Sequence, residues 1–161
     1  MDWSAIFAGI ATLVAVAALI YGIVQHRETV RREFLLWAIE QISAPDQRFA
    51  RKLIFDLNME ENKQRHDELI AGIREGKREL LQSEELGRIR SAFALFDTIG
   101  YFLGRLGYGN MRDAKSLFPQ AVRIWEIGLP YIQAYRERPN QEDSFRNFEL
   151  FAAKLKRAKR K

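Results

Sequence analysis

The chain of 161 residues has no cysteine and only two histidines. It can therefore form no disulfide, and two histidines do not complete the three or four ligands that a zinc ion requires. The lack of cysteine also fits a reducing compartment. The sequence holds no Gly-x-Ser-x-Gly elbow, no phosphate-binding loop and no glycine-rich dinucleotide turn. We accordingly predict no enzymatic activity, and nominate no catalytic, cofactor-binding or metal-binding residue.

Charge is missing from one long segment near the start of the chain. From Trp3 to Val24 there is no Asp, Glu, Lys, Arg, Pro, Asn or Gln. These residues, about 22 in number, would form roughly 33 Å of helix, which is enough to cross a hydrocarbon core of about 30 Å. Trp3 and Tyr21, near opposite ends, suit the two interfaces as aromatic anchors. We expect residues 1–25 to be a transmembrane anchor.

Two other interpretations fit this segment less well. A signal peptide has a basic start and a shorter apolar core, whereas the charged side chain before this run is Asp2. The triplet Ala15-Val16-Ala17 nevertheless resembles a cleavage site and leaves removal of the segment open. A buried helix of a water-soluble domain would normally carry a polar residue every couple of turns.

The flank of the apolar run predicts its orientation. His26, Arg27, Arg31 and Arg32 follow the run, while its other side carries Met1, Asp2 and the amino terminus. Because Lys and Arg resist translocation, the positive-inside rule places the following domain in the cytoplasm. The predicted location is the cytoplasmic membrane, crossed once, with the N-terminus outside.

Small residues recur along the apolar run at alternating steps of four and three. They are Ser4, Ala8, Ala11, Ala15, Ala18 and Gly22. This spacing keeps them on one seam of a left-handed helix pair, where small side chains let two backbones approach closely. The seam predicts packing against a second span, from another membrane protein or a second copy. The alternative is that alanine is simply common in membrane helices.

The remaining residues predict an all-α domain. Prolines are few, and no repeat or Ser/Gly/Pro-rich linker divides the chain. We expect residues 26–42 to form a helical stalk that enters the domain through Phe34 and Trp37, and residues 43–153 to form a compact cytoplasmic bundle of roughly five or six helices.

Local signals place the helices of this bundle. Ser43 is a candidate cap where the stalk ends, ahead of Pro45. Further helices are expected over about 64–75, from Ser83 to about 106, over about 111–136 with breaks or kinks at its prolines, and after Pro139. Gly100 and Gly104 are poor helix formers, which suggests that a neighbouring helix comes close to them.

A few polar and aromatic residues invite a functional interpretation. Asp97 lies in an apolar helix, and we expect it to form a structural pair with an arginine such as Arg123 or Arg136. His66 lies among acidic residues, which indicates a solvated helix start more than a metal site. A ligand pocket, if the bundle has one, would use aromatic residues: Tyr101, Tyr108, Trp125 and Tyr131.

The net charge of +5 is concentrated at the C-terminal end. The predicted tail, residues 154–161, carries six basic residues, namely Lys154, Lys156, Arg157, Lys159, Arg160 and Lys161. Such a tail either stays solvated or contacts anionic lipid headgroups, where each Lys or Arg contributes about 1 kcal/mol. Nucleic-acid binding is disfavoured, because no aromatic residues are interleaved with the basic ones.

A set of short motifs in the second half of the chain resembles an uncharacterised bacterial family, a domain of unknown function. The motifs are Phe96-Asp97-Thr98-Ile99-Gly100, Gly107-Tyr108-Gly109-Asn110-Met111, Trp125, Pro130-Tyr131-Ile132, Arg136, Phe145 and Phe148-Glu149. Members of that family pair one N-terminal span with a helical cytoplasmic domain. The resemblance implies this architecture and a bacterial setting, and it implies no chemistry.

Three functions follow as hypotheses. The preferred one is a membrane-anchored, non-enzymatic interaction protein, either an accessory subunit or a scaffold of a membrane-associated complex. The alternative is a sensor or effector whose bundle binds a small ligand and signals through the stalk helix. A membrane-bound enzyme is the third, and the sequence nominates no residues for it.

Overall fold

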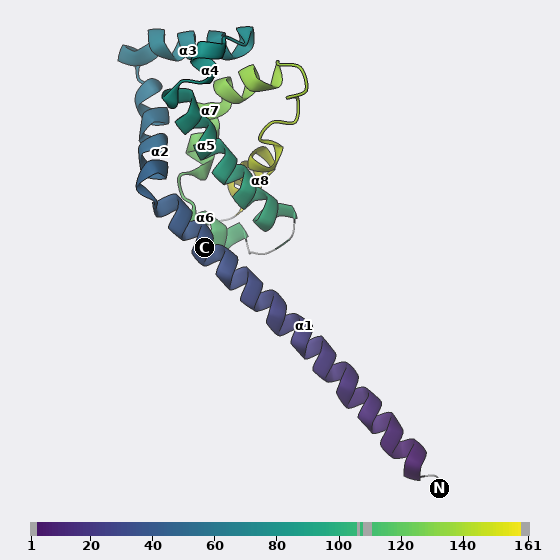
Figure 1. Ribbon diagram of the computed structural model, residues 1–161. Coiled ribbons are helices and arrows are strands. Elements are labelled where there is room, and N and C mark those ends of the chain that lie inside the picture. The colour runs from purple at the N-terminus through teal and green to yellow at the C-terminus, as the bar shows by residue number, and fades with distance from the viewer. Residues whose placement is uncertain (1–2, 106, 108–110, 159–161) are drawn as a thin grey trace. The chain divides into compact units, whose positions relative to one another are not determined.

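The structure is a computed structural model that describes residues 3–105, 107 and 111–158, without the side chains of residues 3–15, 105 and 112. Within these residues every regular element is a helix and no strand is formed, which confirms the all-α class (Figure 1). The chain divides into two compact units, Met1–Leu36 and Trp37–Lys161. Helix α1 (Trp3–Ser43) contributes residues to both.

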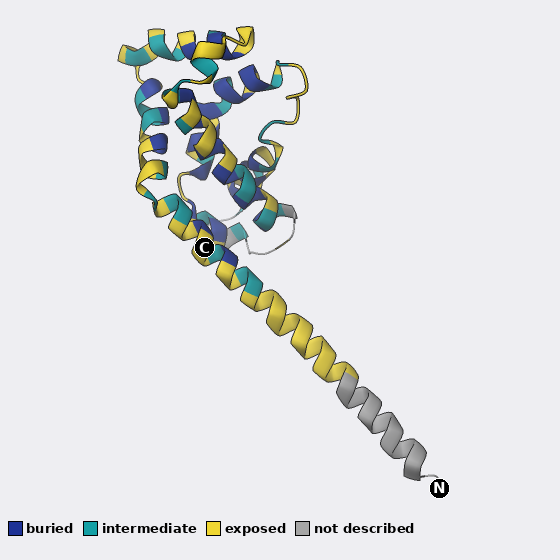
Figure 2. Cartoon of the chain, in the orientation of Figure 1, coloured by how far each residue is buried: buried dark blue, intermediate teal, exposed yellow. Residues whose placement is uncertain are grey.

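The first unit is a continuous stretch of α1. Its large apolar side chains between Val16 and Val24 are 48–65% exposed, and they appear as an unbroken exposed band in Figure 2. Within the described part of the chain, no helix is long and apolar enough to cross a membrane. The side chains of residues 3–15, which include Trp3 and most of the predicted small-residue seam, lie outside the described part.

The second unit contains the end of α1 and a series of shorter helices. They are α2 (Pro45–Leu57), the 3-10 turn η1 (Glu60–Asn62), α3 (Lys63–Glu75), α4 (Arg78–Leu81), α5 (Glu84–Gly100), the π-helical turn η2 (Tyr101–Arg105), α6 (Met111–Leu117), α7 (Ala121–Arg136) and α8 (Arg146–Arg157). The sequence predicted the longer helices and missed η1, α4 and the π-helical end of α5. These short elements carry too few turns to produce a hydrophobic period.

The ends of the helices are set by capping residues and prolines, and one predicted cap, Ser43, is wrong. The predicted helix start at Ser83 is confirmed, and Ser83 caps α5, because its hydroxyl accepts a hydrogen bond from the Leu86 amide at 3.3 Å. Ser43 is instead the last residue of α1, and Ala44 precedes α2 without a side-chain cap. Pro45 starts α2 in its place, since proline at the first helical position has the right φ and needs no amide partner.

The turn between α1 and α2 is held by a buried arginine. Arg51 is only 8% exposed, and its Nη2 donates to the Ile42 carbonyl at 2.8 Å. That carbonyl lies in the last turn of α1, where intrahelical partners run out. Burial, together with the neighbouring charge of Arg48, lowers the pKa of Arg51. Near this turn Ala38 is completely buried, whereas Trp37, which we expected to enter the core, keeps 37% of its surface exposed.

The core of the second unit is aromatic, and most of its largest fully buried side chains come from α5, α7 and α8. Phe96 stacks on Phe148 with ring centroids 5.1 Å apart, and Trp125 meets Phe148 edge-on at 5.2 Å. Phe118 and Phe151 add another edge-on pair at 6.1 Å. Edge-on and offset ring pairs of this kind add to the stabilisation that comes from burying apolar surface.

Gly100 permits the closest approach between α5 and α8. A Cβ built on Gly100 would overlap the backbone carbonyl of Asn147 and lie 2.9 Å from the Cβ of Phe151. The prediction of a close helix contact is therefore confirmed at this glycine. At Gly104 the same construction meets only Lys154 Nζ, at 3.7 Å, which is an ordinary contact.

Replacing Gly100 with alanine tests this packing. The new methyl group must push α8 away, and we expect a loss of about 1–3 kcal/mol in the free energy of unfolding. Gly87→Ala, on an open face of the same helix, is the matched control. It should stabilise the protein by about 0.5–1 kcal/mol, because alanine is the better helix former. Urea unfolding measures both, and equal effects of the two changes would contradict the packing account.

Candidate functional site

Asp97 on α5 joins that helix to the start of α8. Its Oδ1 accepts a hydrogen bond from the Phe148 amide at 2.9 Å, and its Oδ2 accepts one from Asn147 Nδ2 at 3.1 Å. The residue that precedes α8 is Phe145, which offers no side-chain acceptor. The Asp97 carboxylate therefore supplies the N-terminal cap from another helix, where negative charge also suits the helix dipole.

The predicted arginine partners of Asp97 are wrong. Arg123 lies over the Phe55 ring, 4.8 Å from its centroid. Arg136 donates instead to the Ser144 carbonyl and to Glu149, each at 2.9 Å. The free amides at the start of α8 provide a partner that hydrophobic periodicity could not reveal.

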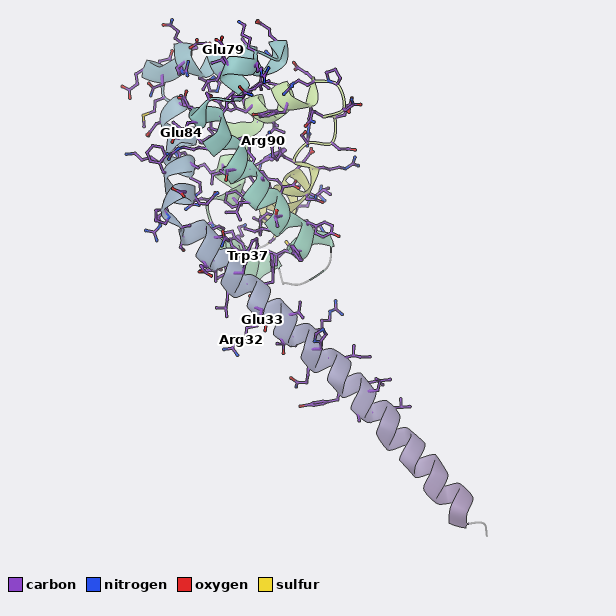
Figure 3. The ribbon with its side chains drawn as sticks, viewed as in Figure 1. Arg32, Glu33, Trp37, Glu79, Glu84 and Arg90 are labelled. Atoms are coloured by element: carbon purple, nitrogen blue, oxygen red, sulfur yellow. The ribbon has the colours of Figure 1, made fainter. Side chains whose placement is uncertain are left out.

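A pocket of about 540 Å³ opens beside Asp97. Its wall comes from α5, from the end of α7 and from the segment that leads to α8; the lining residues are Arg90, Ala94, Asp97, Thr98, Tyr135, Arg138, Gln141, Ser144 and Phe145. We call this the Arg90–Arg138 pocket, and Figure 3 shows Arg90 on α5. Its volume falls in the range of small-molecule sites, about 300–1,000 Å³.

The segment before α8 forms one wall of this pocket and holds unusual backbone angles. Asn140 has φ of 61° and Phe145 has φ of 58°, in the left-handed region that a bulky side chain rarely adopts. Ring contacts stabilise Phe145 there, since it meets Phe93 edge-on at 5.5 Å and Tyr135 at 6.0 Å. Ring packing thus stabilises Phe145 in a backbone conformation that a phenylalanine rarely adopts on its own.

Positive charge dominates the pocket. No ion pair to Arg90 or Arg138 occurs among the described residues. Acidic residues near them along the chain are paired with other cations: Glu84 with Arg88, Glu137 with Arg74, and Asp143 with Arg146. Burial raises the pKa of the Tyr135 hydroxyl, and the charges of Arg90 and Arg138 oppose that rise. Both guanidinium groups therefore act on this hydroxyl.

Most of the predicted membrane residues whose side chains are described are exposed, and Arg31 is half-buried. Tyr21 is exposed, and its hydroxyl accepts a hydrogen bond from Gln25 at 3.0 Å. A Cβ on Gly22 would meet nothing within 4 Å, and Ala18 is also exposed. Arg27 and Arg32 are exposed as well, and Arg32 projects from α1 in Figure 3. Arg31 contacts Glu28 at 3.6 Å. The side chains of Trp3, Ser4, Ala8, Ala11 and Ala15 lie outside the described residues.

The basic tail is partly engaged within the protein. Lys154 donates to the Gly104 carbonyl at 2.6 Å, and Lys156 pairs with Glu126 at 2.7 Å. Arg157 is exposed in the last turn of α8. Lys159, Arg160 and Lys161 lie outside the described residues. The helix thus extends beyond the predicted tail boundary at residue 154.

The aromatic residues proposed for a pocket are not brought together around one. Tyr131 is fully buried, Trp125 belongs to the core and Tyr101 is exposed, while Tyr108 lies outside the described residues. Four pockets in the described part of the chain are lined by other side chains. The Arg90–Arg138 pocket escaped prediction because Arg90, on α5, and Arg138, in the segment after α7, leave no periodic signal.

His66 is less solvated than the sequence suggested. Its ring packs edge-on against Tyr131 with centroids 5.0 Å apart, and Nδ1 lies 3.2 Å from Asp67. Within the described residues, no group of three His, Asp or Glu side chains is placed to hold a metal ion.

Comparisons of the chain with protein-family models, with curated proteins and with solved structures found no match. The resemblance to a bacterial family therefore stays a prediction.

Asp97→Ala tests the cap that joins α5 to α8. The change leaves the Phe148 amide without its acceptor, and we expect a loss of roughly 1–2 kcal/mol in the free energy of unfolding. Asp97→Asn, which keeps an acceptor oxygen, should cost less. Glu142→Ala removes an exposed carboxylate and serves as the control. Chemical denaturation gives the three values, and an Asp97→Ala protein as stable as the control would contradict the capping role.

Proposed function

We propose that the chain is a membrane-anchored, non-enzymatic interaction protein, in which residues 1–25 cross a bilayer and the second unit acts as the cytoplasmic module. The observation that supports this most is the exposed apolar band from Val16 to Val24. Isolated exposed apolar residues are ordinary, but a contiguous band on all sides of a helix needs a cover. Lipid is the cover that an uncharged run of about 22 residues fits.

The continuity of α1 supports the same proposal. Helix α1 runs without a break from Trp3 to Ser43, so the backbone groups of the apolar run are satisfied inside the helix. The exposed Arg27 and Arg32 lie directly after the band, where the positive-inside rule assigns the cytoplasmic side. In the bacterial setting that the family resemblance implies, the membrane is the cytoplasmic one.

The partner is expected within the bilayer. Ala18 and Gly22 leave the helix backbone open on the part of the predicted seam that is described. In lipid, helices associate through van der Waals packing, which such small residues make close. We therefore propose another transmembrane protein or a second copy of the chain as the partner. Arg157 and the residues after it are proposed to contact anionic headgroups, while nucleic acid is not a proposed partner.

A C-terminal reporter tests the orientation. A fluorescent protein that folds only in the cytoplasm should be active when fused after Lys161, and alkaline phosphatase at the same place should be inactive. Replacing Arg27, Arg31 and Arg32 with glutamine should reduce the difference between the two reporter activities. Replacing Arg74, Arg78 and Arg88 with glutamine, as a control, should leave that difference unchanged. Alkaline phosphatase activity from the unaltered sequence would overturn the proposed topology.

Substitutions on the small-residue seam test the partner. Changing Ala11, Ala15 and Ala18 to leucine should remove a specific partner from a pull-down out of native membranes, because the larger side chains hold the helices apart. Val14, Val16 and Leu19 changed to alanine form the control. Retention of the partner by the seam variant would move the interface to the second unit. A lone monomer from mild detergent would count against an interaction protein altogether.

A further inference from the structure

We propose that the Arg90–Arg138 pocket binds a small molecule that carries a phosphate monoester. This site lies entirely within the second unit, so the inference does not depend on the proposed membrane anchor. It favours the ligand-binding alternative for the bundle, at a place other than the aromatic set that the sequence suggested.

The first argument is charge. Two guanidinium groups line one pocket without an ion-pair partner among the described residues. The carboxylate in the wall, Asp97, has its two oxygens engaged by the Phe148 amide and the Asn147 side chain. Glu142 is exposed and does not belong to the lining. The lining thus contains two arginines and one carboxylate, and this net positive set would attract a doubly negative group.

The second argument is the supply of hydrogen-bond donors. Arginine presents a planar fork of N–H groups that matches phosphate oxygens in pairs. Tyr135 also lines the pocket and can offer its hydroxyl as a further donor, although the residue is only 6% exposed. Gln141 accepts from Ser144 Oγ through its Oε1 at 2.9 Å, which leaves its amide N–H groups to donate. Thr98 instead donates to the Ala94 carbonyl at 2.9 Å.

The third argument is size. A phosphate group alone fills a small part of about 540 Å³, so the remainder suits an organic group attached to it. Ala94 and Phe145 add apolar surface to the wall, while Thr98 and Ser144 add hydroxyls. The pocket is thus matched to a small polar metabolite with one phosphate, and less to an extended apolar ligand.

Calorimetric titration of the full-length chain in non-ionic detergent tests the proposal, with glycerol 3-phosphate as the probe. We expect saturable binding of one molecule per chain, while glycerol and acetate bind at least tenfold more weakly. Because charge-assisted hydrogen bonds contribute about 1.5–3 kcal/mol, Arg90→Gln and Arg138→Gln should each weaken binding by roughly tenfold to a hundredfold. Tyr135→Phe should weaken it by a smaller factor.

Arg78→Gln is the matched control, since Arg78 is an exposed arginine outside the pocket. It should leave the affinity unchanged. The thermal unfolding midpoints of all variants identify any that fail to fold. Because Arg90 is solvent-exposed, Arg90→Gln should disturb folding least. Absence of saturable binding in the unaltered chain overturns the proposal, as does an equal affinity in the Arg90→Gln, Arg138→Gln double variant.

A phosphate monoester could come from solution or from a lipid headgroup. Nanodiscs containing phosphatidic acid, compared with nanodiscs of phosphatidylcholine, separate the two. If nanodiscs with phosphatidic acid compete with glycerol 3-phosphate, nanodiscs of phosphatidylcholine do not, and the double variant shows no competition, the site binds a lipid headgroup. If the binding of glycerol 3-phosphate is unchanged in the presence of both kinds of nanodisc, the site binds a soluble ligand. Either result supports binding of a phosphate monoester. A failure of binding would not change what the reporter and pull-down experiments say about the membrane anchor.

Discussion

A helix whose apolar side chains face outward on all sides must be covered, and this constraint governs the first unit of the protein. From Val16 to Val24 the large side chains of α1 remain about half or more exposed. Apolar surface left in water costs roughly 25 cal/mol per Å², so such a band is not a stable surface in water. In the proposed membrane-anchored state, lipid, a second apolar helix or both would remove the cost, and the charged residues after His26 would lie just beyond that cover.

The second unit is instead held together by packing among its own helices. Its central contact, between α5 and α8, depends on a glycine that permits close approach and on a carboxylate that caps the incoming helix. Gly100 and Asp97 lie one turn apart on α5, so one short stretch of sequence determines both the distance and the direction of α8. The same arrangement positions the segment before α8, and that segment completes the Arg90–Arg138 pocket. Packing and the candidate site are therefore consequences of one junction.

The sequence predicted elements whose signals are local. The start of α5 at Ser83 and the close contact at Gly100 were predicted, whereas the Ser43 cap was wrong and Pro45 starts α2 instead. It failed where partners come from distant segments. The Asp97 partner Asn147 lies fifty residues away along the chain. The helix after Pro139 begins only at Arg146, after a segment in which Asn140 and Phe145 have left-handed backbone angles and the Phe145 ring packs against Phe93 and Tyr135. The two pocket arginines also come from separate segments, so no local pattern shows that they line one pocket.

Alkaline carbonate extraction of native membranes tests the central claim most directly. It strips proteins that are held by charge and leaves those that cross the bilayer. The account predicts that the full-length chain stays in the membrane pellet after carbonate and enters solution only with detergent. Recovery of the intact chain in the high-speed supernatant, without detergent, would contradict it.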